Sequence, residues 1–306
     1  MNLSKNTMRL HTVMLNDRVR TSSLLDGIRD VVRPDDIVVD IGTGTGVLAI
    51  AAAHAGARHV YAIESGKIGE VAQNLFKANS LADRITLIKG HSTKINLPER
   101  ADVLVSELIG EEPFEEKVLE VMMDARNRFL KPTGRLLPCA IQVFGLPVTI
   151  PESVRRRLVF TPQAVQDWQA WYNIKFSPLA EISQSSFYSF YFAPSSMRDW
   201  KRLSAPILLA DIDFSLCKET QIGSTATITI DASGELSGLL VYFELKITPT
   251  RSLTTHPALV DTESHWWNPV QVLVDPLSLR AGDQLEITYK YTAVENTTRY
   301  HVRLLR

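Results

Sequence analysis

The sequence predicts a two-domain protein in which an open α/β sheet is followed by an antiparallel β-barrel or sandwich. Three observations support this fold class. The chain has 306 residues, a length typical of one large domain or two ordinary ones. From Asp35 to about Pro147, runs rich in valine and isoleucine alternate with helical patterns, as in parallel strands joined by crossover helices. Beyond residue 150 the runs become alternating and aromatic, as in antiparallel strands.

The individual elements follow from the same patterns. In the first half we expect strands at Ile37–Ile41, His59–Glu64, Ile85–Lys89 and Asp102–Ser106, and helices at Val47–Ala55, about Ile68–Asn79 and about Glu115–Leu130. The last helix is expected to stop before Pro132 and Gly134. In the second half we expect strands at Phe187–Phe192, Ile207–Phe214, Ala226–Ile230, Leu239–Ile247, Val270–Val274, Gln284–Tyr291 and Arg299–Leu305.

The composition excludes several classes of protein. With 45% hydrophobic and 22% charged residues, the chain is not expected to be disordered. No apolar run reaches the roughly 18 residues that span a bilayer, and no hydrophobic signal segment follows the first residues, so we expect no membrane partner and a cytoplasmic location. The net charge is −1 and the only basic run is Arg155–Arg157, which we interpret as solvated surface. No nucleic-acid partner is therefore expected.

The two cysteines, Cys139 and Cys217, are too few for a cysteine-rich zinc site. We interpret them as buried thiols of a cytoplasmic protein, and we expect no metal.

A glycine-rich turn follows the first predicted strand and opens a helix. Gly42, Gly44 and Gly46 allow a ligand to approach the backbone closely. Asp40 stands just before this turn, where a carboxylate repels a pyrophosphate but pairs with an ammonium group. Glu64 ends the second strand and is placed to accept hydrogen bonds from ribose hydroxyls.

An adenosine that carries an amino acid in place of a diphosphate suits both of these carboxylates. The turn resembles the first motif of class I methyltransferases that use S-adenosylmethionine. Its G-x-G-x-G spacing lacks the third glycine position of the dinucleotide fingerprint. A tight turn without a ligand and a nicotinamide site remain as alternatives at this point.

Six glutamates follow the fourth predicted strand within a short segment. Glu107 stands at the carboxyl end of that strand, where ligand chemistry occurs in parallel sheets. For Glu111, Glu112, Glu115 and Glu120, the ordinary interpretation is a charged loop and an acidic helix start.

Three segments together resemble one enzyme family. The run Ser-Glu-Leu-Ile-Gly at 106–110, followed by Glu116, resembles the double-glutamate hairpin of the protein arginine methyltransferases. Residues 11–21 are similar to the family's segment before the cofactor fold, and Ser-His-Trp at 264–266 resembles its Thr-His-Trp loop. The resemblance extends over residues 11–306.

This resemblance implies a Rossmann-like class I methyltransferase domain followed by an antiparallel β-barrel domain. Residues 1–34 would form a helical segment packing on the cofactor site, 35–145 the cofactor-binding domain and 146–306 the β-barrel substrate domain. The aromatic segment at about 164–182 falls where the family places a dimerisation arm, so a homodimer is expected. The alternative is that these aromatic residues fill the barrel's own core.

The resemblance also implies four catalytic residues. Glu107 and Glu116 would clamp the substrate guanidinium. His265 would pair with Asp17 across the domain seam.

Further residues are implied to contact the ligands. Met14 would border the acceptor nitrogen, and Trp266 would help to wall the arginine channel. The residues implied to contact the cofactor S-adenosylmethionine are Arg20 at its carboxylate, Asp40, Gly42, Gly44 and Gly46 at its methionine part, Glu64 at its ribose, and Ser92 and Thr93 near its adenine.

The chemistry of such a clamp follows from the guanidinium itself. Its pKa lies above about 12 and its lone pairs are delocalised, so at neutral pH it is charged and a poor nucleophile. Two carboxylates can hold its planar fork by charge-assisted hydrogen bonds and aim one nitrogen at the sulfonium methyl.

The acceptor is left open among an arginine-containing protein, a peptide and a small guanidino compound. Members of the family usually carry paired tyrosines just before the segment that resembles residues 11–21, whereas residues 1–6 contain no aromatic residue. Two alternative functions remain: methylation of a different amine, and a catalytically inactive cofactor-binding partner. The presence of Glu107 and Glu116 argues against the second alternative.

Overall fold

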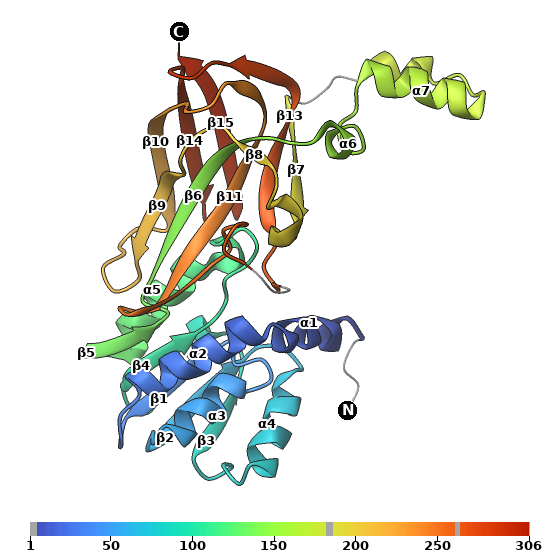
Figure 1. Ribbon diagram of the computed structural model, residues 1–306. Helices are drawn as coiled ribbons and strands as arrows, with labels where there is room; N and C mark the ends of the chain where they lie inside the picture. Colours follow the sequence, from blue (N-terminus) through green and yellow to red (C-terminus); the bar gives the residue numbers. More distant parts are fainter. Residues whose placement is uncertain (1–4, 182–185, 261–263, 306) are drawn as a thin grey trace.

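The computed structural model describes residues 5–181, 186–260 and 264–305, and it contains two domains stacked end to end (Figure 1). An α/β domain lies at the bottom of the view and an antiparallel β domain at the top. This arrangement confirms the predicted fold class of a Rossmann-like sheet followed by a β-barrel.

Five parallel strands form the sheet of the α/β domain in the order β3-β2-β1-β4-β5. The strands are β1 (Ile37–Ile41), β2 (His59–Glu64), β3 (Ile85–Lys89), β4 (Ala101–Ser106) and β5 (Leu130–Leu137). The first three have the predicted bounds. Because β1 runs parallel to β2 on one side and to β4 on the other, the carboxyl ends of these three strands lie side by side at one edge of the sheet.

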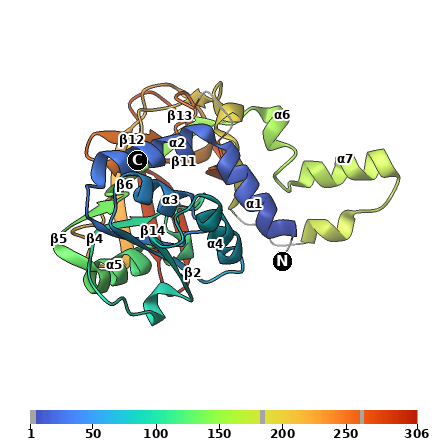
Figure 2. The same ribbon diagram turned by 90° about the horizontal axis from the view of Figure 1, so that it is seen from below.

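The helices of this domain enclose the sheet. They are α1 (Lys5–Asn16), α2 (Arg18–Val31), α3 (Val47–His54), α4 (Gly69–Ala78) and α5 (Val118–Phe129), with short 3-10 turns η1 (Ser92–Lys94) and η2 (Glu115–Lys117). Figure 2 shows α1 and α2 running end to end along one side of the domain. A Cβ on Gly27 of α2 would lie 2.4 Å from Cγ2 of Ile247, so α2 packs closely against the barrel domain as well.

Strand β5 was not predicted. The helical pattern was expected to reach Leu130, but α5 ends at Phe129 and Leu130 begins the strand. Pro132 and Gly134 suggested a break, yet β5 tolerates them because it is an edge strand. The two residues also fall where the pairing with β4 shifts register, between the Ala101 and Val103 pairs.

The barrel domain is built from antiparallel pairs. One sheet has the order β7-β13-β11-β6-β8, with β12 also on β11 and β9 also on β6, and the other has the order β10-β14-β15. The strands are β6 (Ala140–Thr149), β7 (Phe187–Phe192), β8 (Lys201–Arg202), β9 (Ile207–Asp213), β10 (Gln221–Thr229), β11 (Gly234–Thr248), β12 (Arg251–Thr254), β13 (Asn268–Leu279), β14 (Gln284–Thr292) and β15 (Thr297–Leu305).

Strand β6 places the start of the barrel. It pairs with β11 from Ala140 onward and was not predicted as a strand. Residues 145 and 146, between which we drew the domain division, both lie in β6.

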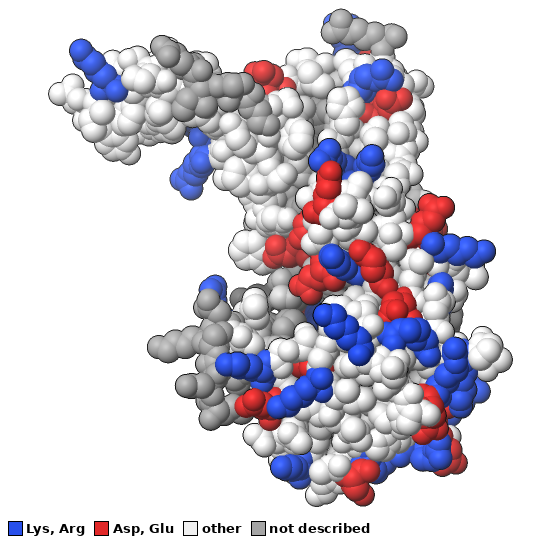
Figure 3. All heavy atoms as spheres, turned by 180° about the vertical axis from the view of Figure 1, so that it is seen from behind, with Lys and Arg blue, Asp and Glu red and all other residues white. Residues whose placement is uncertain are grey.

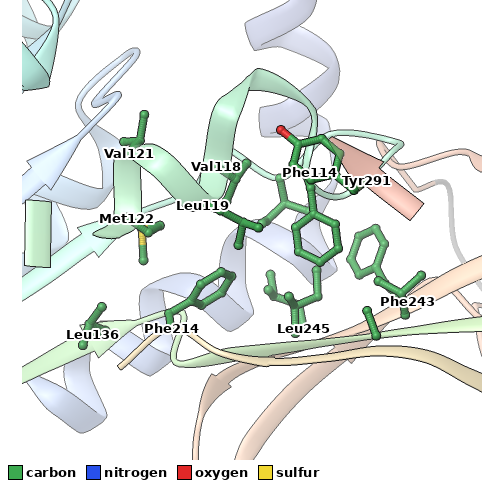
Figure 4. Packing of buried hydrophobic residues seen from close by; sticks show 14 of the residues in the cluster. Phe114, Val118, Leu119, Val121, Met122, Leu136, Phe214, Phe243, Leu245 and Tyr291 are labelled. Atoms are coloured by element: carbon green, nitrogen blue, oxygen red, sulfur yellow. The ribbon is translucent and has the colours of Figure 1, made fainter. Parts of the chain in front are cut away.

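The two domains share one hydrophobic core. Figure 4 shows Phe114 and Leu119, from the segment after β4, facing Phe243 and Leu245 of β11 and Tyr291 of β14. All five side chains are buried. The interface between the two domains is therefore part of this buried core.

An arm projects from the barrel domain (Figure 1). It contains α6 (Glu152–Arg155), α7 (Pro162–Tyr172) and the 3-10 turn η3 (Ser177–Glu181), while η4 (Pro194–Met197) lies after β7. Trp171 is 66% exposed and Tyr172 is 61% exposed, so these two rings do not fill the barrel core. Figure 3 shows the visible face of the arm as largely uncharged. Residue 182 of the predicted arm lies outside the described residues.

Two further observations concern the chain as a whole. Cys139 and Cys217 are free thiols and only partly buried, which corrects the expectation that both are buried. Within the described ranges, every helix is too short or too polar to cross a membrane.

Candidate functional site

A cavity of about 420 Å³ lies at the carboxyl ends of β1, β2 and β4, where α1 and α2 cover it. Its lining combines residues of all these elements with one barrel loop: Leu10, His11, Met14, Leu15, Arg20, Thr21, Leu24, Gly42, Thr43, Gly44, Thr45, Val47, Leu48, Glu64, Ser65, Ile68, Glu107, Leu108, Glu116 and His265. Most of the predicted site residues therefore meet at one place.

The glycine loop after β1 presents backbone to this cavity. Gly42 has φ +71° and Gly44 has φ +54°, a left-handed conformation that favours glycine. A Cβ on Gly42 would lie 2.6 Å from Cδ2 of Leu108, and one on Gly44 would lie 2.8 Å from Cε1 of His11. Gly46 is the N-cap of α3 and packs on Phe76 instead of lining the cavity.

The two carboxylates predicted for the cofactor differ in their surroundings. Glu64 lines the cavity and accepts hydrogen bonds from the backbone N–H of Gly44 at 2.9 Å and of Gly66 at 2.6 Å. Asp40 is 1% exposed, and one of its oxygens accepts a hydrogen bond from the Thr43 hydroxyl. Its other oxygen has no hydrogen-bond partner among the described residues, and burial raises the pKa of Asp40 to about 7. Asp40 is therefore enclosed behind the glycine loop.

Arg20 and Glu107 form a buried ion pair at the floor of the cavity. The Arg20 guanidinium also lies over the Trp266 ring, 5.3 Å from its centroid. Burial lowers the pKa of Arg20 to about 10, and its Nε is buried without a hydrogen-bond partner among the described residues. The second oxygen of Glu107 accepts the backbone N–H of Ile109 at 2.9 Å.

Glu116 reaches the same cavity through an unusual backbone. Glu116 has φ +65° and Lys117 has φ +59°, so two successive residues with side chains adopt the left-handed conformation just before α5. Such residues cost roughly 1–3 kcal/mol each and cluster at functional sites. Burial raises the pKa of the Glu116 carboxyl. The loop therefore turns the Glu116 side chain toward the cavity that Glu107 also lines.

Asp17 and His265 meet across the domain seam, but not through the imidazole. Asp17 is the N-cap of α2 and accepts the backbone N–H of Arg20 at 2.9 Å. Its other oxygen accepts the backbone N–H of His265 at 2.8 Å. The imidazole lines the cavity, and burial lowers the pKa of His265. The next residue, Trp266, is 3% exposed and donates its indole N–H to the Ile109 carbonyl at 2.8 Å.

The remaining predicted residues divide into two groups. Met14 lines the cavity, and its carbonyl accepts the Thr21 hydroxyl at 3.1 Å. Ser92 and Thr93, in η1, do not line it. The Ser92 carbonyl accepts a hydrogen bond from Arg128 at 2.7 Å, and the Thr93 hydroxyl bonds to the His91 ring at 2.8 Å.

Two family profiles match the chain. The profile described as ribosomal protein L11 methyltransferase (PrmA) matches residues 19–177, and the arginine methyltransferase oligomerization subdomain matches residues 158–304. The chain is 33% identical over 285 residues to the probable histone-arginine methyltransferase 1.4 of Arabidopsis thaliana, covering 89% of this chain and 52% of that protein. The chain belongs to the protein arginine methyltransferase family.

Other relatives agree with this family. The chain is 28% identical over 299 residues to the protein arginine N-methyltransferase PRMT10 of Arabidopsis thaliana, covering 90% of this chain and 77% of that protein. The fold matches the solved Trypanosoma brucei PRMT1 enzyme-prozyme heterotetrameric complex with AdoHcy, with a TM-score of 0.78 and 24% identity over 97% of this chain and 98% of that chain. The chain spans about half the length of the plant histone-arginine methyltransferases that it matches.

Two features in and beside this candidate site were not predicted from the sequence. His11 of α1 covers Gly44, although only its segment had been noted. Glu112 was expected to be a charged loop residue, yet it is 5% exposed and accepts the Tyr300 hydroxyl of β15 at 2.7 Å. Burial raises the pKa of Glu112 to about 7. No local pattern identifies a partner so distant in the sequence.

Proposed function

We propose that this protein transfers a methyl group from S-adenosylmethionine to a guanidino nitrogen of arginine. The observation that supports this function is the meeting of Glu107 and Glu116 on one cavity with the glycine loop. The acceptor in this proposal is an arginine side chain of a protein or peptide, with a small guanidino compound as the alternative.

The cavity suits the cofactor in three ways. Gly42 and Gly44 line the cavity and carry no side chain, so a ligand can approach their backbone directly. Glu64 is held at the end of β2 with its carboxylate at the cavity, where it can accept hydroxyl hydrogen bonds. The unpartnered Nε of Arg20 is a buried donor suited to a carboxylate. When bound, S-adenosylmethionine supplies a methyl group on a positively charged sulfur.

The remaining predicted cofactor contacts have more limited parts in this proposal. Asp40 and Gly46 shape the glycine loop from behind. Ser92 and Thr93 are left out because neither lines the cavity.

The chain's own residues then orient the acceptor. Glu107 and Glu116 accept hydrogen bonds from the guanidinium and hold its plane, which fixes which nitrogen faces the methyl donor. Methylation of that nitrogen releases one proton. Glu116 is the proposed acceptor of this proton, because burial already raises the pKa of its carboxyl. Met14 lines the cavity and would border the side chain that carries the guanidinium. Trp266 does not line the cavity, and its ring lies against the Arg20 guanidinium.

A labelling experiment tests the function. The protein is incubated with isotope-labelled S-adenosylmethionine and a panel of arginine peptides, the matching lysine peptides and free arginine, and fragmentation mass spectrometry locates the label. We expect it on guanidino nitrogens. Label on lysine alone would support the alternative amine methyltransferase, and cofactor binding without any transfer would support an inactive partner.

Variants of the clamp test its residues. Glu107→Gln and Glu116→Gln should each lower turnover about 100-fold, as expected for the loss of one placed electrostatic partner. The affinity for S-adenosylhomocysteine, measured by calorimetry, should be retained in Glu116→Gln. Glu120→Gln is a matched control, since Glu120 belongs to the same acidic segment and does not line the cavity. Near-normal turnover in both clamp variants would refute the assignment.

We further propose that the protein is a homodimer formed through the arm. Trp171, Tyr172 and Ile174 are 66%, 61% and 55% exposed, and aromatic residues of this kind anchor interfaces. The oligomerization profile includes this segment. Light scattering should give a mass twice that of one chain. The double substitution Trp171→Ser and Tyr172→Ser should lower the measured mass to that of a single chain. A monomeric wild-type protein at working concentration would refute the proposal.

A cytoplasmic location is proposed as well. It is supported by the free thiols of Cys139 and Cys217, since reducing compartments keep cysteines in this form.

A further inference from the structure

The hairpin between the two clamp glutamates is attached to the barrel domain at three points. The Trp266 indole donates to the carbonyl of Ile109 at 2.8 Å. The ring centroids of Phe114 and Tyr291 are 5.7 Å apart. Figure 4 labels both side chains in the shared core. The third point is polar: the Tyr300 hydroxyl donates to Glu112 at 2.7 Å.

The polar attachment is enclosed. Glu112 is 5% exposed and Tyr300 is 7% exposed, so little water reaches the bond between them. A buried carboxylate without a hydrogen-bond partner is strongly disfavoured. The Tyr300 hydroxyl therefore holds Glu112 in one place, and Glu112 holds the middle of the hairpin to β15.

This bond lies directly next to the turn that presents Glu116. The backbone carbonyl of Glu112 accepts the N–H of Glu115 at 3.1 Å, and the next residue is the left-handed Glu116. Since this backbone conformation is strained, surrounding contacts must maintain it. We propose that the Glu112–Tyr300 bond positions Glu116 for guanidinium binding, and that both residues act through Glu116 without contacting the substrate.

The role differs from general stability because the hairpin has other anchors. Phe114 and Leu119 are fully buried and Val118 is 2% exposed, so apolar packing holds the end of the hairpin and the start of α5 independently. Loss of the polar bond should therefore leave the fold intact while loosening the turn at Glu116.

The main test removes one hydroxyl. Tyr300→Phe keeps the ring and its contact with Tyr289, whose centroid lies 5.5 Å away. We expect KM for an arginine peptide to rise about tenfold, with unchanged affinity for S-adenosylhomocysteine and faster amide hydrogen exchange in residues 111–117. A matched control is Tyr61→Phe. The Tyr61 hydroxyl donates a hydrogen bond of 3.3 Å to Glu99, and neither residue lines the cavity.

Two substitutions of Glu112 separate positioning from charge. Glu112→Gln keeps an oxygen that accepts the Tyr300 hydrogen bond, so KM should stay within about threefold of the wild type. Glu112→Leu removes the acceptor and should match Tyr300→Phe.

Several results would overturn the proposal. Unchanged KM and unchanged exchange in Tyr300→Phe would do so, and so would an equal KM increase in the Tyr61→Phe control. The inference rests on the proposed arginine clamp, but its failure is distinguishable. Absence of arginine methylation by the wild-type protein refutes the clamp, whereas exchange in residues 111–117 reports on the positioning bond regardless of activity.

Discussion

Replacing Asp17 with asparagine should destabilise the protein more than removing the His265 imidazole. The two oxygens of Asp17 have separate donors, the backbone N–H of Arg20 and the backbone N–H of His265. Asparagine offers one oxygen and one NH₂ group, so one of these two N–H groups would face another donor. His265→Ala, in contrast, leaves both hydrogen bonds in place.

The expected difference follows from the burial of Asp17, which is 5% exposed. A hydrogen bond to a charged group contributes about 1.5–3 kcal/mol, and an N-cap contributes about 0.5–2 kcal/mol. Since Asp17→Asn loses one such bond and little water can replace it, we expect the free energy of unfolding to fall by about 2–3 kcal/mol. His265→Ala should lower it by less than about 1 kcal/mol, as usual for a partly exposed side chain.

Urea denaturation, followed by tryptophan fluorescence, measures the free energy of unfolding of both variants. The comparison is best made at pH 8, where His265 is neutral because burial lowers its pKa. An equal or larger loss of stability in His265→Ala would show that the imidazole holds the domain seam, and it would refute the backbone contact.

Two further predictions concern the glycine loop and the buried Glu112. Gly44→Ala should weaken binding of S-adenosylhomocysteine at least tenfold, because φ is +54° and the new Cβ would lie 2.8 Å from His11; unchanged affinity by calorimetry would contradict this. Burial, with repulsion from Glu115 and Glu111, raises the pKa of Glu112 from 4.5 to about 7 despite the hydrogen bond from Tyr300. Between these pH values the folded state binds more protons than the unfolded state, so this residue's contribution to stability falls as pH rises. The stability of Glu112→Gln relative to wild type should therefore increase from pH 5 to pH 8, by up to about 3 kcal/mol, and a difference that is independent of pH would contradict the reasoning.

The fold could be predicted where burial leaves a local pattern. Strands β1, β2 and β3 were found because strands of a parallel sheet are rich in valine and isoleucine. Strands β5 and β6 were missed because each contains glycine and proline, which usually interrupt strands. In β5 an edge position and a register shift accommodate these residues, whereas Gly145 and Pro147 of β6 lie in regular register with β11.

The candidate site shows the same division. Gly42, Gly44 and Glu64 follow strands whose ends meet, so their spacing already indicated a shared cavity. The pairing of Asp17 with His265 was implied only by the family resemblance. The group of His265 that donates to Asp17 is a backbone N–H, which leaves no signal in the sequence. The bond between Glu112 and Tyr300 depends on which barrel strand packs on the hairpin, and that arrangement is not encoded in either local segment.

The most direct test of the clamp compares the binding of two peptides that differ only in the functional group at the end of one side chain. Citrulline has nearly the shape of arginine but carries oxygen in place of one guanidinium nitrogen, and it is neutral. Calorimetry in the presence of S-adenosylhomocysteine should show that an arginine peptide binds at least about 100-fold more tightly than its citrulline counterpart, and the combined Glu107→Gln and Glu116→Gln substitutions should abolish this preference. Equal affinity for the two peptides, or a preference that survives in the double variant, would contradict the proposal that these two carboxylates bind a planar cation.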